Sequence, residues 1–254
     1  MSNFKSTYLY DVGGRKSVRW IQKRIKTKVN NIDKRLIKIL DIGCGTCQLT
    51  KIVAENFDCE ILAIDIDEKS INMAKKSVKN KNITFKLLDI EKECIEEKFD
   101  IILMTQVIDH LKNPLSVLSK ISKMYLEQDG ILIIGVSNGK GLYERSKKRH
   151  KFDMSYLKNK HGRNLREMPY TCNTDSPHLW EYDKDMLVEM LNKSGLKIRM
   201  FKKIAFLLPV FPLNRIYFSA PIFISTILDF IDGVVANCMP IPMVSNWYIE
   251  CKKR

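Results

Sequence analysis

Short apolar runs alternate along the chain with segments whose apolar residues recur at helical spacing. Apolar runs that predict buried strands occupy residues 37–42, 61–64, 83–88, 99–104, 131–136, 196–201 and 246–252. Helical spacing or helix-capping residues mark 15–29, 49–57, 68–80, 114–130 and 183–195. Because strands and helices alternate, the pattern predicts an α/β fold with a mostly parallel sheet and helices on both faces.

A glycine turn joins the first two predicted strands. Residues 37–67 read IKILDIGCGTCQLTKIVAENFDCEILAIDID. Gly43 and Gly45 lack a Cβ, so they can adopt positive φ and let a ligand approach the backbone. The next helix points unpaired N–H groups at the same place. Asp65 ends the second strand, where an acid can accept hydrogen bonds from ribose hydroxyls. The stretch therefore predicts a nucleotide-type crevice.

Two cofactors compete for this crevice. Dinucleotide folds prefer a third glycine in G-x-G-x-x-G, and that position here is Gln48. Asp41 also stands two residues before Gly43. The run DIGCGT at 41–46, with DID at 65–67, resembles motif I and its acidic partner in class I S-adenosylmethionine (SAM) methyltransferases. SAM is therefore favoured over NAD.

Further segments resemble the methyltransferases of ubiquinone and menaquinone biosynthesis. They are LLDI at 87–90, TQVIDHLKNPLSVLSKISKMYLEQDGILIIGVSN from Thr105, and SPHLWEYDKDMLVEMLNKSGLKI up to Ile198. The resemblance implies a Rossmann-like class I methyltransferase fold within one domain, 1–254. Its sheet would have seven strands, and the antiparallel last strand would lie beside the sixth. Residues 37–137 would form the SAM-binding core.

The resemblance also implies which residues bind the cofactor. Asp89 would meet the adenine amino group, an apolar neighbour would pack on the ring, and residues 105–107 would line the pocket. The predicted cofactor-binding residues are Asp41, Gly43, Cys44, Gly45, Asp65, Ile66, Asp89, Ile90, Thr105 and Gln106.

Methyl transfer requires a base only when the acceptor must lose a proton, as a hydroxyl does. The catalytic candidates are Asp109, His110 and His178. Asp109 and His110 are predicted to open the helix after the fourth strand, where capping is the alternative role. His178 lies in a loop beside Trp180, and a structural imidazole is its alternative. The four histidines show no ligand spacing with cysteine or acid, so no metal site is predicted.

Charge and cysteine content bear on the expected partners and cellular compartment of the protein. The net charge of +14 is concentrated at 15–38, with ten basic residues and one acid, and at 140–166, with ten and two. These patches suit phosphate groups, nucleic acid or an anionic membrane surface, unless they are only solvated faces. Seven cysteines suit reduced thiols in the cytosol, and the first ten residues resemble no signal segment, so we expect a cytoplasmic protein. Cys44 and Cys47 are interpreted as loop packing.

Three segments lie outside the predicted core. Residues 1–36 form a basic helical extension that either covers the pocket or packs on the core. Residues 138–183 form a basic insertion on the substrate side. Residues 204–243 form an apolar insertion broken by prolines, in which Ser225, Asp229 and Asp232 share one face of an amphipathic helix at 222–235. Peripheral contact with a membrane, a cover over a lipophilic substrate, and packing in a homodimer all remain open.

The predicted function is SAM-dependent methyl transfer, most readily to an oxygen. The acceptor would be a small lipophilic or lipid-linked molecule, such as a quinol or polyprenyl-type compound, or a sugar. RNA methylation is an alternative because of the basic charge, but residues 105–109 read TQVID rather than an NPPY-type signature. A SAM-binding protein without catalysis is the third hypothesis.

Overall fold

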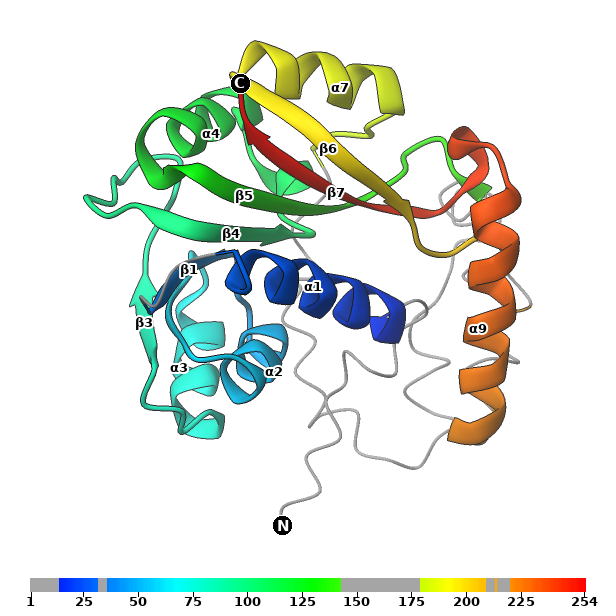
Figure 1. Cartoon of the computed structure of the whole chain (residues 1–254), viewed down its shortest axis with the longest axis horizontal. Coiled ribbons are helices and arrows are strands. Elements are labelled where there is room, and N and C mark those ends of the chain that lie inside the picture. The colour runs from blue at the N-terminus through cyan, green and yellow to red at the C-terminus, as the bar shows by residue number, and fades with distance from the viewer. Residues whose placement is uncertain (1–13, 32–35, 143–178, 209–212, 214–219) are drawn as a thin grey trace.

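The computed structural model describes residues 14–31, 36–142, 179–208, 213 and 220–254. In this part of the chain, strands form one sheet in the order β3-β2-β1-β4-β5-β7-β6 (Figure 1). The strands are β1 (Ile37–Ile42), β2 (Cys59–Asp65), β3 (Ile83–Leu87), β4 (Phe99–Thr105), β5 (Leu126–Ser137), β6 (Leu196–Lys203) and β7 (Asn246–Lys253). Strand β7 is antiparallel to both β5 and β6, and the other pairs are parallel. The predicted fold class is confirmed.

Short polar side chains cap the starts of α3, α4 and α7. The longer helices are α1 (Gly14–Val29), α2 (Gln48–Asn56), α3 (Glu68–Ser77), α4 (Pro114–Lys120), α7 (Lys184–Lys193) and α9 (Ile222–Cys238). The short helical turns are η2 (Ile108–His110), η3 (Ile121–Tyr125) and η5 (Ile241–Met243). The carboxylates of Asp67 and Asp183 accept hydrogen bonds from the first-turn N–H groups of α3 and α7. Gly195, at φ +80°, ends α7 as predicted.

The prediction that Gly130 ends the helix starting at Pro114 is wrong. Helical structure stops at Tyr125, and β5 starts at Leu126. Leu126 is fully buried and pairs with Phe99 of β4, with a register irregularity before Ile101. The buried pairing therefore starts the strand before the glycine, which lies inside β5.

Alternate residues of the central strands enter two cores, one on each face of the sheet. Leu40 and Ile102 belong to the core covered by α4 and α7. Ile39 and Ile101 belong to the core covered by α1, α2 and α3 (Figure 1). Both faces of these strands are buried, as in parallel sheets of α/β proteins, so the apolar runs are nearly continuous.

Helix α1 belongs to the second core. Ile21 and Ile25 are fully buried, and the ring of Trp20 meets that of Tyr248 edge-on, with centroids 6.1 Å apart. Arg24 forms an ion pair with Glu250 of β7. Of the two alternatives for the basic extension, α1 shows packing on the core, and a role over the pocket stays a prediction.

The segment after β5 connects to the end of the apolar insertion. The Asn138 side chain donates to the carbonyl oxygens of Pro242 (2.9 Å) and Val244 (2.7 Å), which follow α9. Helix α9 is therefore anchored beside the edge where the parallel strands end (Figure 1). Within the described residues, every helix is too short or too polar to cross a membrane.

The ends of the basic insertion meet at the same edge. The N–H of Gly139 donates to the Tyr182 carbonyl (3.0 Å), and Lys140 forms an ion pair with Asp183 at 2.5 Å. Both ends of the insertion therefore meet next to β5. Residues 143–178, which hold most of the predicted basic patch, lie outside the described residues.

Replacing Ile21 with Ala tests whether α1 is part of the core. The change removes fully buried methyl groups, so we expect the free energy of unfolding to fall by about 2–5 kcal/mol in urea titrations. Lys23→Ala changes an exposed residue of the same helix and should stay within about 0.5 kcal/mol of the unaltered protein. Equal stability of the two variants would contradict a core role for α1.

Candidate functional site

The loop between β1 and α2 has the left-handed backbone that the sequence predicted. Gly43 has φ +68°, Gly45 has φ +54°, and Cys47 has φ +59°. The N–H groups of Gly43 and Cys44 both donate to the carbonyl of Ile64 at the end of β2. A Cβ on Gly43 would lie 2.2 Å from Val107 Cγ2. Only glycine fits this position, because the loop contacts the segment after β4 there.

Asp65 holds the glycine loop against the end of β2. Its Oδ2 accepts the N–H of Gly45 at 2.7 Å, and its Oδ1 accepts that of Asp67 at 2.9 Å. Burial raises the pKa of Asp65, while these backbone donors act in the opposite direction. Each carboxylate oxygen keeps capacity for a second hydrogen bond, so the group suits a pair of ribose hydroxyls.

Ile66 adds an exposed apolar side chain beside this acid. It is 68% exposed, although the residues directly before it, 61–65, are buried or half-buried. An apolar side chain next to a hydrogen-bonding carboxylate suits a ligand with both a flat ring and hydroxyl groups. An adenosine group has both, so Asp65 and Ile66 fit the nucleoside part of SAM.

Asp41 lies beneath the glycine loop. Its carboxylate accepts a hydrogen bond of 2.5 Å from the Thr50 hydroxyl on α2, and the pair is buried. Burial raises the pKa of Asp41 to about 7, and the nearby Asp65 carboxylate also raises it. Asp41 therefore fixes α2 to β1, and its predicted role toward the cofactor stays a prediction.

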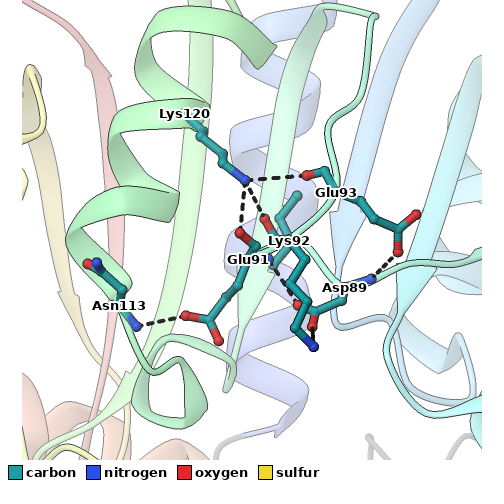
Figure 2. Close-up of polar contacts among 7 residues, drawn as sticks. Asp89, Glu91, Lys92, Glu93, Asn113 and Lys120 are labelled. Carbon is teal, nitrogen blue, oxygen red and sulfur yellow. Dashed lines mark hydrogen bonds and ion pairs between the residues drawn. The ribbon is translucent and has the colours of Figure 1, made fainter.

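Asp89 lies in a turn after β3 that is held by several polar contacts (Figure 2). Its Oδ1 accepts the N–H of Glu91 at 3.0 Å, and Lys92 lies 2.9 Å from its Oδ2. Burial acts to raise the pKa of Asp89, but Lys92 and the backbone donors outweigh it, so the pKa is lowered. Lys120 of α4 donates to the carbonyls of Ile90 and Glu91. The turn therefore keeps a carboxylate at the sheet edge.

The predicted packing of Ile90 on an adenine ring receives no support from its surroundings. The Ile90 side chain is buried in the core beneath α4, whereas Ile66 is exposed. A side chain committed to the core has little surface left for a ligand. The role of Ile90 at the cofactor stays a prediction.

The residues after β4 complete the same edge. Thr105 ends the strand, and Gln106 has φ +56°. The Gln106 N–H donates to Gly135 at 2.8 Å, and its side-chain oxygen accepts the Ser137 hydroxyl at 3.1 Å. Non-glycine residues with positive φ are strained, and such strain concentrates at functional sites. In the described part of the chain, the non-glycine residues with positive φ are Cys47 and Gln106, and both lie at this edge.

Asp109 and His110 form the turn η2 rather than the start of α4, so that prediction is wrong. Asn113 caps α4 instead, because its side chain accepts the Ser116 N–H and Pro114 opens the helix. The Asp109 side chain is 3% exposed and that of His110 is 24% exposed. His110 Nε2 lies 4.0 Å from the Asp109 carboxylate. His110 is therefore the more accessible candidate.

The chain that returns from the basic insertion binds this turn. The N–H groups of Leu179 and Trp180 donate to the Asp109 carbonyl, and Trp180 Nε1 donates to Leu111 at 2.7 Å. The Tyr182 hydroxyl donates to Ile108, and burial, aided by the Asp109 charge, raises the Tyr182 pKa. His178, the third predicted catalytic residue, lies outside the described residues.

Cys44 and Cys47 act as packing groups in the glycine loop. Their Sγ atoms lie 3.7 and 4.0 Å from the Gly45 carbonyl. The neighbouring Cys47 thiol and burial raise the pKa of Cys44, which disfavours the reactive thiolate. Among the residues that the structure describes, no group of histidine, cysteine and acid side chains could hold a metal.

Two polar residues of the site were missed from the sequence. Thr50 binds Asp41, and Ser137 binds Gln106. A polar residue on the apolar side of a predicted helix was a usable signal for Thr50. Ser137 gave no such signal, because its partner depends on the pairing of β4 with β5.

Comparisons with known proteins agree with this geometry. A family model described as "Methyltransferase domain" matches residues 33–193. A malonyl-[acyl-carrier protein] O-methyltransferase from Bacillus cereus is 36% identical over 98 residues, which are 38% of this chain and 36% of that protein. A ubiquinone biosynthesis O-methyltransferase from Pelagibacter ubique is 33% identical over 127 residues, 48% of this chain and 52% of that protein. The chain thus spans about half or less of these relatives.

The solved structures show the same fold at low sequence identity. Magnesium protoporphyrin IX methyltransferase from Synechocystis, solved with bound S-adenosylhomocysteine (SAH), matches with a TM-score of 0.56 and 14% identity. The match covers 96% of this chain and 84% of that one. An S-adenosylmethionine-dependent methyltransferase from Clostridium acetobutylicum matches with a TM-score of 0.59 and 13% identity, over 96% and 92% of the two chains.

Asp65→Ala tests the predicted nucleoside contact. We expect the affinity for SAH in calorimetric titrations to fall by roughly 1–3 kcal/mol, about 5- to 150-fold in Kd, because the hydroxyl acceptors are lost. Asp58→Ala removes an exposed acid at the other end of β2 and should bind SAH normally. Unchanged affinity in a folded Asp65→Ala variant would exclude the proposed contact.

The buried carboxyl of Asp41 should make stability depend on pH. Its folded pKa of about 7 exceeds the ordinary value of 3.8, so its contribution to stability is full below pH 3.8 and is lost as the pH rises through about 7. We expect the free energy of unfolding to fall relative to that of Asp41→Asn by at most about 1.4 kcal/mol per pH unit in this window. Urea titrations of both proteins from about pH 4 to pH 8 measure this difference. A constant difference would show that Asp41 stays ionised.

Proposed function

Because the chain belongs to the methyltransferase domain family, whose cofactor is S-adenosylmethionine, we propose that it transfers a methyl group to an oxygen of a small lipophilic or lipid-linked acceptor. The observation that carries the cofactor part is the glycine loop held by Asp65 beside the exposed side chain of Ile66. The oxygen acceptor is supported by the B. cereus and P. ubique relatives, both of which are O-methyltransferases by name.

The chain's own residues would bind and align the cofactor. The backbone of the loop from Gly43 to Gly45 leaves room for close approach, and the Asp65 carboxylate would accept hydrogen bonds from the ribose. Bound SAM supplies a methyl group activated by its positive sulfur. The protein then mainly aligns the acceptor oxygen with that methyl group, since direct displacement needs a linear arrangement.

An acceptor hydroxyl would also have to lose a proton. His110 suits the role of general base, because its imidazole is partly exposed. The adjacent Asp109 carboxylate, 4.0 Å from His110 Nε2, is buried. The short turn that carries both residues follows Val107, which touches Gly43 in the cofactor loop. His178 is the second proposed base. A carboxylate acceptor would need neither histidine, because it carries no proton.

The lipophilic character of the acceptor is supported by apolar surface at the active edge, which is the edge of the sheet where the parallel strands end. Leu179 and Trp180 are exposed where the basic insertion returns to η2. Exposed apolar side chains also line α9, which is anchored to the end of β5. An apolar acceptor would cover such surface. The relatives named above give no support to the RNA alternative.

A labelling experiment distinguishes the acceptor classes. SAM labelled on its methyl group is incubated with the protein and a whole-cell extract, and the label is measured in organic solvent, water and acid-precipitated polymer. We expect label in the organic phase, because a lipophilic acceptor partitions there. The Asp65→Ala variant, assayed below saturating SAM, should give less label.

The other outcomes contradict parts of the proposal. Label in water would indicate a sugar or another polar acceptor. Label in the acid-precipitated polymer would support methylation of RNA or of protein. A protein that binds SAH but labels no fraction would favour the hypothesis of a SAM-binding protein without catalysis.

A further inference from the structure

Helix α9 carries its polar residues toward the protein and its apolar residues outward. Ser225, Asp229 and Asp232 are all buried. Between residues 223 and 234 all exposed side chains are apolar, and we call them the outward face: Phe223, Ile224, Ile227, Phe230, Ile231 and Val234. Phe223 is 73% exposed and Phe230 is 71% exposed. A surface helix of a globular protein normally has the opposite arrangement.

Specific partners hold the polar residues inward. Arg15 of α1 forms an ion pair of 3.0 Å with Asp229. The Asp232 carboxylate accepts the backbone N–H groups of Phe206, Leu207 and Leu208 at 3.0, 2.7 and 3.2 Å. Buried carboxylates need such partners, so rotating α9 to hide its apolar side would leave both charges unpaired. The exposure of the outward face is therefore built into the packing of α9.

The outward face is continuous and uncharged. At about 100° per residue, its six side chains occupy an arc of roughly 120° on the helix. The charged residues of α9 are Asp229 and Asp232, which both face inward. Exposed apolar surface of this size marks an interaction site. The helix is about 25 Å long, and every described helix is too short or too polar to cross a membrane.

Positive charges border α9. Lys202 donates to the Asn237 side chain at 2.9 Å, and Lys203 donates to the Asn237 carbonyl at 2.5 Å, near the end of the helix. Arg15 of α1 meets the middle of the helix from the inward side, where it neutralises Asp229, so the flanking cations are Lys202 and Lys203. The chain as a whole has a net charge of +14. An uncharged apolar strip bordered by cations complements a surface with apolar chains below anionic headgroups.

We propose that the outward face of α9 lies in the interface of a membrane that carries anionic lipid headgroups. The axis of α9 then lies in the membrane plane, with the outward face among the acyl chains and the flanking cations at the headgroups. A second copy of the chain fits less well, because pairing two outward faces would bring the same cations together on two chains of charge +14.

This placement brings the active edge to the membrane. Asn138, directly after β5, is bonded to the segment that follows α9, so the helix cannot dock without bringing the carboxyl edge of the sheet close. An acceptor dissolved in the bilayer would then reach the protein without crossing water. This benefit rests on the proposed function, whereas the docking itself does not.

Vesicle flotation with the full chain tests the docking without any acceptor or SAM. One set of vesicles contains phosphatidylcholine alone, and the other contains about 30% phosphatidylglycerol. We expect roughly tenfold stronger partition to the anionic vesicles, and weakening at high salt. The double variant Phe223→Gln, Phe230→Gln should lose roughly tenfold in partition, because it removes two exposed rings without filling or opening the core.

A matched control changes exposed methionines elsewhere. Met73→Gln with Met124→Gln alters α3 and η3 and should partition like the unaltered protein. SAH titrations check that all variants are folded. Absence of vesicle binding, or equal binding of the phenylalanine variant, would overturn the proposal. A dimer in analytical ultracentrifugation that dissociates only in the phenylalanine variant would assign α9 to a second copy. None of these results depends on methyl transfer, so failure here leaves the labelling experiment intact.

Discussion

The hydrogen bond from the Gly45 N–H to the Asp65 carboxylate is the constraint on which the site depends. It joins the loop after β1 to the end of β2. The loop can bend that way because Gly43 and Gly45 adopt positive φ, and Gly43 then lies against Val107 after β4. Three strand ends are thus brought together by one backbone donor and one glycine contact. A side chain at Gly43 would separate the loop from β4.

The order of strands and helices could be predicted because the apolar pattern is strong. Central strands such as β1 and β4 are buried on both faces, so their sequences are nearly continuous apolar runs. The exact residues at which the strands and helices end were harder to predict from the sequence. The first residues of β5 pair irregularly with β4, and no local signal shows that Leu126 prefers a strand to the preceding helix. Such ends depend on tertiary pairing rather than on glycine as a helix breaker.

The site was predictable where backbone geometry dictates residue type. Glycines in the loop and an acid after β2 are required by close approach and hydrogen bonding, so they are visible in the sequence. The positive φ of Gln106 was not, because nothing in the residue itself predicts that strain. Thr50 was visible as a polar residue on the apolar side of a predicted helix, but its partner Asp41 could be assigned only from the packing of α2 on β1. The burial of Ile90 likewise follows from tertiary packing, whereas the cap at Asn113 is local, since Asn113 directly precedes Pro114 and binds Ser116.

The orientation of α9 could not be predicted for the same reason, because it depends on tertiary contacts. Its periodicity shows one polar and one apolar face, but not which of them contacts the protein. That choice is made by Arg15 of α1 and by the N–H groups of residues 206–208, which follow β6. Both lie outside α9, so the sequence of the helix alone does not show them. Both carboxylates are buried with partners while the apolar side chains stay exposed, and an unpaired buried charge would be costly. The proposed contact with an anionic lipid surface would give the exposed apolar face a function, because acyl chains would cover it.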